Sequence, residues 1–329
     1  MKRSRLILLF LSFAIGFSSK VNAQDPQFTQ FYSVPLYLAP SFAGATQQHR
    51  VAMDYRAQWL KLPGSYNTFI ASYDRYLTKY NSGFGLLFMR DEAGSGKLGM
   101  MYVSLLYSYD ILLFKVWHVR PGLSFYYDMY NLDFSRLVFP DQLGANGITP
   151  GTVVPPPSSE NRGMIDGSAS TLIYNSRIWF GFTTDHLLLP NLSFYGDNTH
   201  MSLKYTFYGG AKLISMGRLL KPTDESVSIA YQLRLQGDYK QLDVGLYWNS
   251  SPLVLGLWYR GIPPLNSQRG DALAFLAGVK RYGWSVAYSY DFTVSNLVGS
   301  TAGAHELSLT FEFTTTHRKK IHAIPCPEF

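Results

Sequence analysis

The sequence predicts an all-β fold: an outer-membrane β-barrel of about 14 antiparallel strands, preceded by an exported amino-terminal segment. Three observations support this fold class. Aromatic residues make up 16% of the chain and charged residues only 16%, whereas soluble domains carry about 25% charged residues. The first residues have the order of a secretory signal. Several segments alternate strictly between apolar and polar residues over roughly ten positions, the length of a tilted membrane strand.

The alternation is clearest in four segments, at 201–213, 226–236, 283–293 and 305–313. In "GWSVAYSYDFT", from Gly283, large apolar side chains occupy every second position and small or acidic ones lie between them. Successive strand residues point to opposite faces, so such a segment has one apolar and one polar face. Strands of a secreted sandwich are shorter, about 5–6 residues. The pattern therefore favours a lipid-facing barrel with a polar lumen over a sandwich or propeller.

The strands are expected near 50–59, 66–77, 82–91, 98–110, 115–128, 166–174, 177–184, 201–214, 225–236, 239–249, 252–260, 271–281, 283–293 and 304–314. An even count places both ends of the barrel at one rim. Tight turns should then lie at that rim, except for a longer turn at 215–224, and long connections such as 129–165 at the other. Outer-membrane barrels have short periplasmic turns and long external loops. Both termini are therefore expected in the periplasm.

Residues 1–23 are interpreted as a signal peptide. Three cations open this segment, an apolar run follows over 6–17, and it ends with Val21, Asn22 and Ala23. The run is too short for a membrane helix, which needs about 20 residues. The mature chain would begin at Gln24. Four of the 29 basic residues lie in the signal, leaving 25 against 22 acidic ones, which does not suggest nucleic-acid binding.

No motif in the sequence indicates an enzyme, a cofactor or a metal. The pattern "GSGKLG" at 94–99 has the glycine spacing of a dinucleotide-binding motif. That motif needs a helix directly after it, whereas this pattern is expected in a hairpin loop before another strand. The spacing of His317, His322 and Cys326 is interpreted as a solvated tail rather than a metal site. A single cysteine excludes an intrachain disulfide. We therefore expect no catalytic residues; an enzyme inside the barrel would need a Ser or Asp with a His at the rim.

Four short motifs and the chain's end carry a family resemblance. The motifs are "QDPQFTQ" from Gln24, "LAPSFAG" from Leu38, "YRAQW" from Tyr55 and "SYD" from Ser72, and the chain ends in "PCPEF". Together they resemble the PorP/SprF family of outer-membrane proteins, which are associated with type IX secretion and gliding in Bacteroidota. The departures are Thr29, Ala39 and Ala57, where the family commonly has Ser, Asn and Asn. The motifs cover residues 24–76 and the tail; the middle matches only as a barrel pattern.

The resemblance implies a non-enzymatic component of the type IX secretion or gliding machinery. Such a protein would assist export or surface anchoring of adhesins, or dock periplasmic motor components at the outer membrane. Expected partners are outer-membrane lipid, periplasmic ring or motor proteins, and adhesins or their carboxyl-terminal domains. The alternative is an outer-membrane channel for passive or substrate-specific diffusion, and the third class is an outer-membrane enzyme.

The segment 24–49 raises a physical question, because its prolines forbid a regular strand while its aromatic residues offer apolar anchors. We expect it to fold into the barrel mouth as a plug, held by Arg56 and Asp74, with 50–314 forming the barrel. The alternative is a loosely packed periplasmic cap. The tail 315–329 is expected in the periplasm as a docking element for a partner. The candidate plug or partner residues are Gln27, Phe28, Gln30, Phe31, Tyr32, Pro40, Gly44, Tyr55, Arg56, Trp59, Tyr73, Asp74, Pro325, Cys326, Pro327 and Phe329.

Overall fold

The computed structural model describes residues 25–62, 64–94, 96–144, 147–218, 221–261, 272–294 and 301–314, with the side chains of 215–224 left out. The expected signal peptide over 1–23 and the expected tail over 315–329 therefore lie outside the described residues. Within the described part of the chain, no helix has the length and apolar character needed to cross a membrane.

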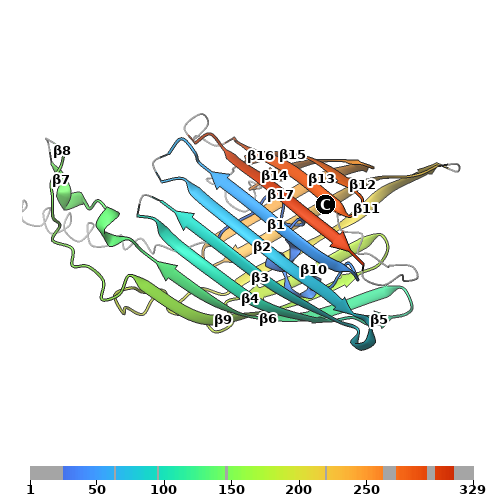
Figure 1. Cartoon of the computed structure of the whole chain (residues 1–329), viewed down its shortest axis with the longest axis horizontal. Coiled ribbons are helices and arrows are strands. Elements are labelled where there is room, and N and C mark those ends of the chain that lie inside the picture. The colour runs from blue at the N-terminus through green and yellow to red at the C-terminus, as the bar shows by residue number, and fades with distance from the viewer. Residues whose placement is uncertain are drawn as a thin grey trace, which may run out of the picture.

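Fourteen long strands of the described chain form one closed antiparallel sheet, which confirms the predicted fold class (Figure 1). Each strand pairs with its neighbours in sequence, and β1 pairs with β17 to close the ring. The strands are β1 (His49–Gln58), β2 (Tyr66–Leu77), β3 (Ser82–Ala93), β4 (Leu98–Tyr109), β6 (Trp117–Asn131), β9 (Asn161–Tyr174), β10 (Ile178–Asp185), β11 (Lys204–Arg218), β12 (Lys221–Gln236), β13 (Tyr239–Ser250), β14 (Leu253–Arg260), β15 (Ala272–Arg281), β16 (Trp284–Thr293) and β17 (Ala304–Phe313).

The observed boundaries differ from the expected ones mainly in three strands. β9 begins five residues earlier than expected, at Asn161 rather than at 166. The longer turn expected at 215–224 is wrong: β11 continues to Arg218 and β12 starts at Lys221. The ladder between them runs past the ends of β10 and β13, with register shifts after Lys212 and Met216. Beyond those ends, β11 and β12 pair only with each other, and their hairpin projects past the rim (Figure 1).

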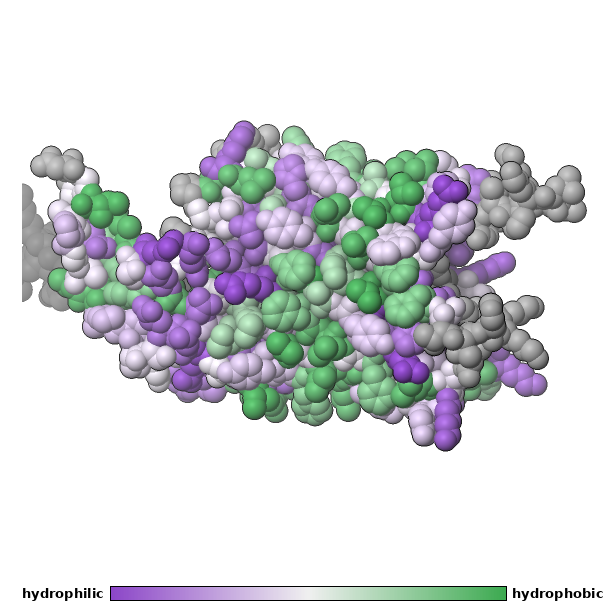
Figure 2. Space-filling view, viewed as in Figure 1, coloured by the Kyte–Doolittle hydropathy of each residue, from purple (hydrophilic) through white to green (hydrophobic). Residues whose placement is uncertain are grey.

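The two faces of the wall differ as the alternation predicts. Leu105 and Phe125 face outward and are each 67% exposed, while their neighbours Ser104 and Ser124 are buried in the lumen. Apolar and aromatic side chains accordingly cover much of the face between the rims that Figure 2 shows. This is the surface of a barrel whose outside contacts lipid and whose inside is polar.

Connections of different length separate the two rims. The short-turn rim is formed by 78–81, 110–116, 175–177, 251–252 and 282–283, and it also holds the ends of β1 and β17, where His49 pairs with Phe313. The turn 110–116 contains the short strand β5 (Ile111–Leu113). The long-loop rim holds the connections 59–65, 94–97, 132–160, 186–203 and 237–238. Its longest loop carries the two-residue strands β7 (Leu143–Gly144) and β8 (Gly147–Ile148) away from the barrel (Figure 1). The "GSGKLG" pattern lies in the β3–β4 hairpin, as expected.

Candidate functional site inside the barrel

Residues 25–48, the interior segment, lie inside the barrel and cross it from one rim to the other. The segment has no strand; it contains the single helical turns α2 (Pro35–Leu38) and η1 (Pro40–Phe42), each begun by a proline. Proline suits the first position of a helix, where its missing N–H has no intrahelical partner. Gln30, Ser41 and Ala43 are almost fully buried. A segment without a ladder must satisfy its polar groups from the lumen wall.

The path of the interior segment differs from the expected position of the amino terminus. Gly44, near the end of the segment, contacts Asp74 beside the start of β1 at the short-turn rim. Asp25, the first described residue, contacts His186 and Lys204, which lie where β10 ends and β11 begins at the long-loop rim. Both ends were expected at the short-turn rim. The structure places Phe313 there and Asp25 near the opposite rim.

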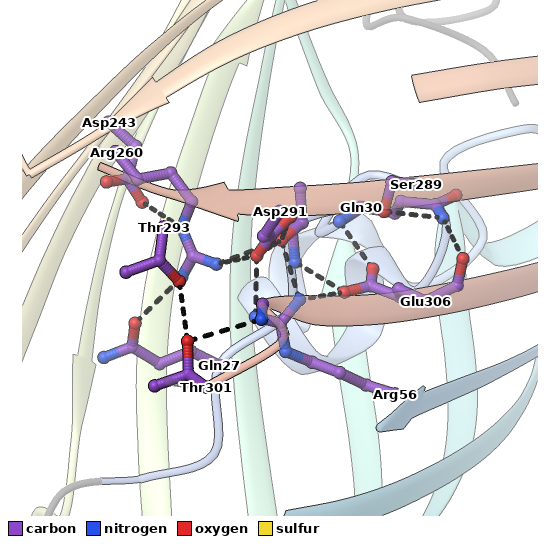
Figure 3. Close-up of polar contacts among 12 residues, drawn as sticks. Gln27, Gln30, Arg56, Asp243, Arg260, Ser289, Asp291, Thr293, Thr301 and Glu306 are labelled. Carbon is purple, nitrogen blue, oxygen red and sulfur yellow. Dashed lines mark hydrogen bonds and ion pairs between the residues drawn. The ribbon is translucent and has the colours of Figure 1, made fainter. Parts of the chain in front are cut away.

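Arg56 lies at the centre of the contacts between the interior segment and the wall (Figure 3). Its guanidinium donates to Asp291 at 2.7 Å, to Glu306 at 2.7 Å and to the Thr29 hydroxyl at 2.8 Å. Glu306 in turn accepts the backbone N–H groups of Thr29, at 2.8 Å, and Gln30, at 2.6 Å. These charged groups are almost fully buried, where charge-assisted hydrogen bonds are strong.

Arg260 extends this cluster around the lumen (Figure 3). It donates to Asp291 at 2.7 Å, to Thr29 at 3.0 Å and to the side-chain oxygen of Gln27 at 3.1 Å, and its Nε lies 3.8 Å from Asp243. We call Arg56, Arg260, Asp243, Asp291 and Glu306 the arginine–carboxylate network. Removing one partner from a buried ion pair leaves an uncompensated charge, which is strongly destabilising. The network therefore depends on every member.

Gln30 completes the contacts on β16 and β17. Its side-chain amide donates to Ser289 and to the Glu306 carbonyl, each at 3.2 Å, and its oxygen accepts the Ser308 hydroxyl at 2.7 Å. A buried glutamine with its donors and its acceptor engaged has one defined orientation. This residue locks the interior segment against two wall strands.

A second charged cluster holds Asp25. The imidazole of His186 lies between Asp25, at 3.0 Å, and Asp166, at 2.9 Å, and Lys204 donates to Asp25 at 2.7 Å. Burial opposes the charge on His186, but Asp25 and Asp166 outweigh it and raise the pKa of His186 to about 10. Burial alone would raise the pKa of Asp25, yet Lys204 and His186 hold it well below its ordinary value. Both groups are therefore ionised at neutral pH.

The short-turn end of the interior segment is held through its backbone. The Gly44 N–H donates to Asp74 at 2.8 Å, and Arg50 donates to the other oxygen of Asp74 at 2.8 Å. Arg120 donates to the carbonyl oxygens of Ser41 and Ala43, and Ser108 also donates to Ala43. Carbonyl groups at the end of a helical turn have no partner within the turn, so the wall supplies one.

Wall glycines make room for this end of the segment. A Cβ atom on Gly83 would overlap the carbonyl oxygen of Ala43, and one on Gly122 would overlap backbone atoms of Pro40 and Ser41. Gly44 itself has a φ of 66°, which side chains rarely adopt. Backbone therefore packs directly against backbone at the short-turn end.

Aromatic side chains fill the middle of the lumen. Phe31 packs edge-on against Trp258 with ring centroids 5.1 Å apart, and Phe42 lies 5.6 Å from Tyr208. Tyr32 contacts Trp179 and Trp258 at 6.3 Å each. These separations are those of favourable aromatic pairs. The segment thus has polar contacts toward both ends and an aromatic core between them.

A cup lies at the long-loop rim of the described chain. Its volume is about 700 Å³, and Asp25, Pro26 and Gln27 of the interior segment form part of its lining. Wall residues around it include Trp59 and Tyr66, whose rings meet edge-on with centroids 5.1 Å apart. Trp59 has a φ of 60°, which is uncommon for a bulky residue. The interior segment therefore separates a cup at one rim from the close backbone packing at the other.

The sequence-based candidates divide into four groups by location. In the lumen lie Gln27, Phe28, Gln30, Phe31, Tyr32, Pro40, Gly44, Arg56 and Asp74. Tyr55 and Tyr73 face outward, 48% and 40% exposed, because they alternate with the inward-facing Arg56 and Asp74, while Trp59 lies at the long-loop rim. Pro325, Cys326, Pro327 and Phe329 lie outside the described residues.

Sequence reasoning missed the wall partners of the interior segment. These are Arg120, Asp166, His186, Lys204, Arg260, Asp291 and Glu306. A signal was present: a charged residue at a lumen-facing position of an alternating strand, as in "SYDF" or "HELS", needs a partner inside the barrel. The sequence does not say which charge meets which.

Comparison with known proteins gives the following similarities. The chain is similar to the outer membrane protein Omp33 of Acinetobacter baumannii, with 8% identity over 82% of this chain and 100% of that chain, and a TM-score of 0.45. It is similar to the P. putida toluene transporter TodX, with 10% identity over 84% and 93%, and a TM-score of 0.48. The KdgM porin shows 11% identity over 80% and 99%, and a TM-score of 0.34.

No curated protein matches the chain. The family model described as "Type IX secretion system membrane protein PorP/SprF" matches residues 20–311, which is most of this chain. That span includes the interior segment and nearly the whole barrel wall. The chain is therefore a member of the PorP/SprF family of type IX secretion system membrane proteins, an outer-membrane β-barrel.

Proposed function

We propose that this protein is a non-enzymatic, filled barrel that serves type IX secretion or gliding as a scaffold in the outer membrane. In this role it assists export or surface anchoring of adhesins, or docks periplasmic motor components. The observation that carries the proposal is the attachment of the interior segment by Arg56, which joins Thr29 to Asp291 and Glu306 inside the lumen.

The attachment supports a scaffold over a diffusion channel. A passive channel needs a continuous water path, and the interior segment occupies the lumen with buried aromatic rings and ion pairs. Opening such a path would require buried charges to lose their partners, which is costly. The cup at the long-loop rim is the feature that favours the second candidate, a substrate-specific channel, because about 700 Å³ suits a small ligand.

In a scaffold with a filled lumen, partners meet the protein at its rims and its outer wall. We assign the short-turn rim to the periplasm, as in other outer-membrane barrels, and the long-loop rim to the cell exterior. The proposed boundaries are a signal peptide over 1–23, a plug over 24–49 that belongs functionally to the barrel over 50–314, and a periplasmic tail over 315–329 that binds a partner.

Single-channel recording in planar bilayers tests the proposal. The intact protein should conduct poorly, and a variant lacking residues 25–43 behind the signal should form steady open pores. In cells, the same deletion should reduce surface display of adhesins while the barrel still inserts, as judged by heat-modifiable mobility in dodecyl sulphate. High, steady conductance from the intact protein would favour the channel instead.

A further inference from the structure

The short-turn rim carries exposed cations and no exposed carboxylate in its described turns. The turns 78–81, 110–116, 175–177, 251–252 and 282–283, together with Arg281 at the end of β15, hold four exposed cations, Lys79, Lys115, Arg177 and Arg281, while Asp110 in the second turn is buried. The described loops of the opposite rim hold three cations, Lys61, Lys97 and Arg136, against the five carboxylates of Asp133, Asp141, Glu160, Asp197 and Asp238. The described turns of the two rims therefore differ in the sign of their charge.

The pairing of these cations also differs between the rims. At the long-loop rim, Lys97 lies 3.3 Å from Glu92 and Arg136 lies 2.7 Å from Asp133. Among the described residues, none of the four short-turn cations has a carboxylate within ion-pair distance. No carboxylate of the described chain therefore neutralises the charge of these four side chains.

Three of the four cations are adjacent in sequence to a strongly exposed aromatic residue. Tyr80, Phe114 and Tyr282 are 59%, 89% and 85% exposed. Lys79 lies 5.4 Å from the ring centre of Tyr80, and the Arg281 guanidinium lies 4.8 Å from that of Tyr282. Aromatic rings at the ends of membrane strands sit at headgroup level, and long basic side chains beside them extend to the same level. The turns therefore hold their cations where lipid phosphates lie.

We propose that Lys79, Lys115, Arg177 and Arg281 form a binding collar for the phosphate headgroups of anionic phospholipids in the leaflet at the short-turn rim. The cations lie in or directly beside four of the five described turns of this rim and so are distributed around the barrel, with the arc from β10 to β14 contributing none of the four. A single acidic protein would meet one arc of such a ring, whereas a lipid annulus meets all of it. The collar also continues the apolar outer wall, where Phe84 and Tyr107 are exposed.

Lipid retention by the full-length protein tests the collar. The protein is reconstituted in nanodiscs of equal parts phosphatidylglycerol and phosphatidylcholine, and co-purifying lipids are counted by native mass spectrometry. We expect about tenfold enrichment of phosphatidylglycerol over phosphatidylcholine, since each cation near an anionic surface contributes measurably. The quadruple variant Lys79→Gln, Lys115→Gln, Arg177→Gln and Arg281→Gln should lose this enrichment.

The matched control is the triple variant Lys61→Gln, Lys97→Gln and Arg136→Gln at the long-loop rim. This variant should retain the enrichment of phosphatidylglycerol. Equal retention of the two lipids by the wild-type protein would overturn the proposal. Displacement of phosphatidylglycerol by millimolar inorganic phosphate would assign the collar to a free anion and also overturn it. If the quadruple variant does not insert, the double variants Lys79→Gln/Arg281→Gln and Lys115→Gln/Arg177→Gln decide the matter, and each should lose part of the enrichment.

Discussion

The barrel wall and the interior segment lie in contact inside the lumen, yet they are stabilised in different ways. Each wall strand pairs with two neighbours through backbone ladders, and β2 and β3 are joined by a hairpin over Tyr66–Ala93. The interior segment has no ladder, and several of its contacts are with residues far along the chain: Thr29 meets Glu306 across 277 positions. Local repetition stabilises the wall, and a few specific long-range contacts hold the segment.

This difference predicts that substitutions on the lipid-facing side of the wall are tolerated better than substitutions on its lumen-facing side. One lipid-facing substitution removes little from the wall, because lipid replaces the lost contacts and the ladders remain. One lumen substitution can remove a partner that nothing replaces. Changes at the lumen face should therefore release the segment while leaving the barrel intact, and three experiments examine this separation.

The largest effect is expected for Arg56→Ala. This variant leaves Glu306 without its arginine partner and removes a donor from Thr29 and Asp291. Breaking a buried ion pair costs about 3–5 kcal/mol. Hydrogen exchange of backbone amides in 25–45 should accelerate by about a hundredfold or more, while the exchange of β-strand amides remains slow.

Leu105→Ala on the outer wall is the matched control for Arg56→Ala. Leu105 is 67% exposed, and exchange in the interior segment should not change in this variant. Equal acceleration of segment and wall amides in Arg56→Ala would contradict the separation of the two regions, because it would show that they unfold together.

A smaller and more local effect is expected for Gly83→Val. The new side chain would meet the Ala43 carbonyl oxygen, which is backbone and cannot rotate away. Overpacking of this kind costs about 1–3 kcal/mol. Hydrogen exchange of the backbone amides of residues 40–45 should accelerate. Exchange at residues 28–31 should not change, because the arginine–carboxylate network still holds that part of the interior segment. The control Gly144→Ala, which adds only ordinary van der Waals contacts, should leave both ends protected.

The most local effect is expected from pH, acting through His186, which contacts the Asp25 end of the interior segment. Its pKa is raised to about 10 in the folded protein, above the ordinary value of about 6.5. A raised histidine pKa adds stability that is complete below about pH 6.5 and is lost as pH rises through about 10. Exchange of amides near Asp25, corrected for intrinsic rates, should therefore accelerate between about pH 7 and pH 10. A His186→Gln variant that kept the same pH dependence would exclude His186 as its origin.

The wall could be predicted from the sequence because its determinants are local. Period-2 alternation and turn length define each strand and its lumen face without knowledge of any other strand, and β2 was placed at its observed bounds, Tyr66–Leu77. The alternation was less informative near Lys212, where register shifts interrupt it and the hairpin of β11 and β12 runs on. The lumen position of Arg56 and Asp74 follows from the same alternation.

By itself, then, the sequence determined an exported β-barrel, the lipid-facing and lumen-facing positions of its strands, and an amino-terminal segment unable to join the sheet. Only the tertiary structure decided that this segment runs through the lumen to the long-loop rim and that Arg56 meets Asp291 and Glu306. The physical reason is that pairing between buried charges depends on ring closure. Closing the sheet brings β1, β14, β16 and β17 around the interior segment, and no local pattern encodes which of their charges will meet.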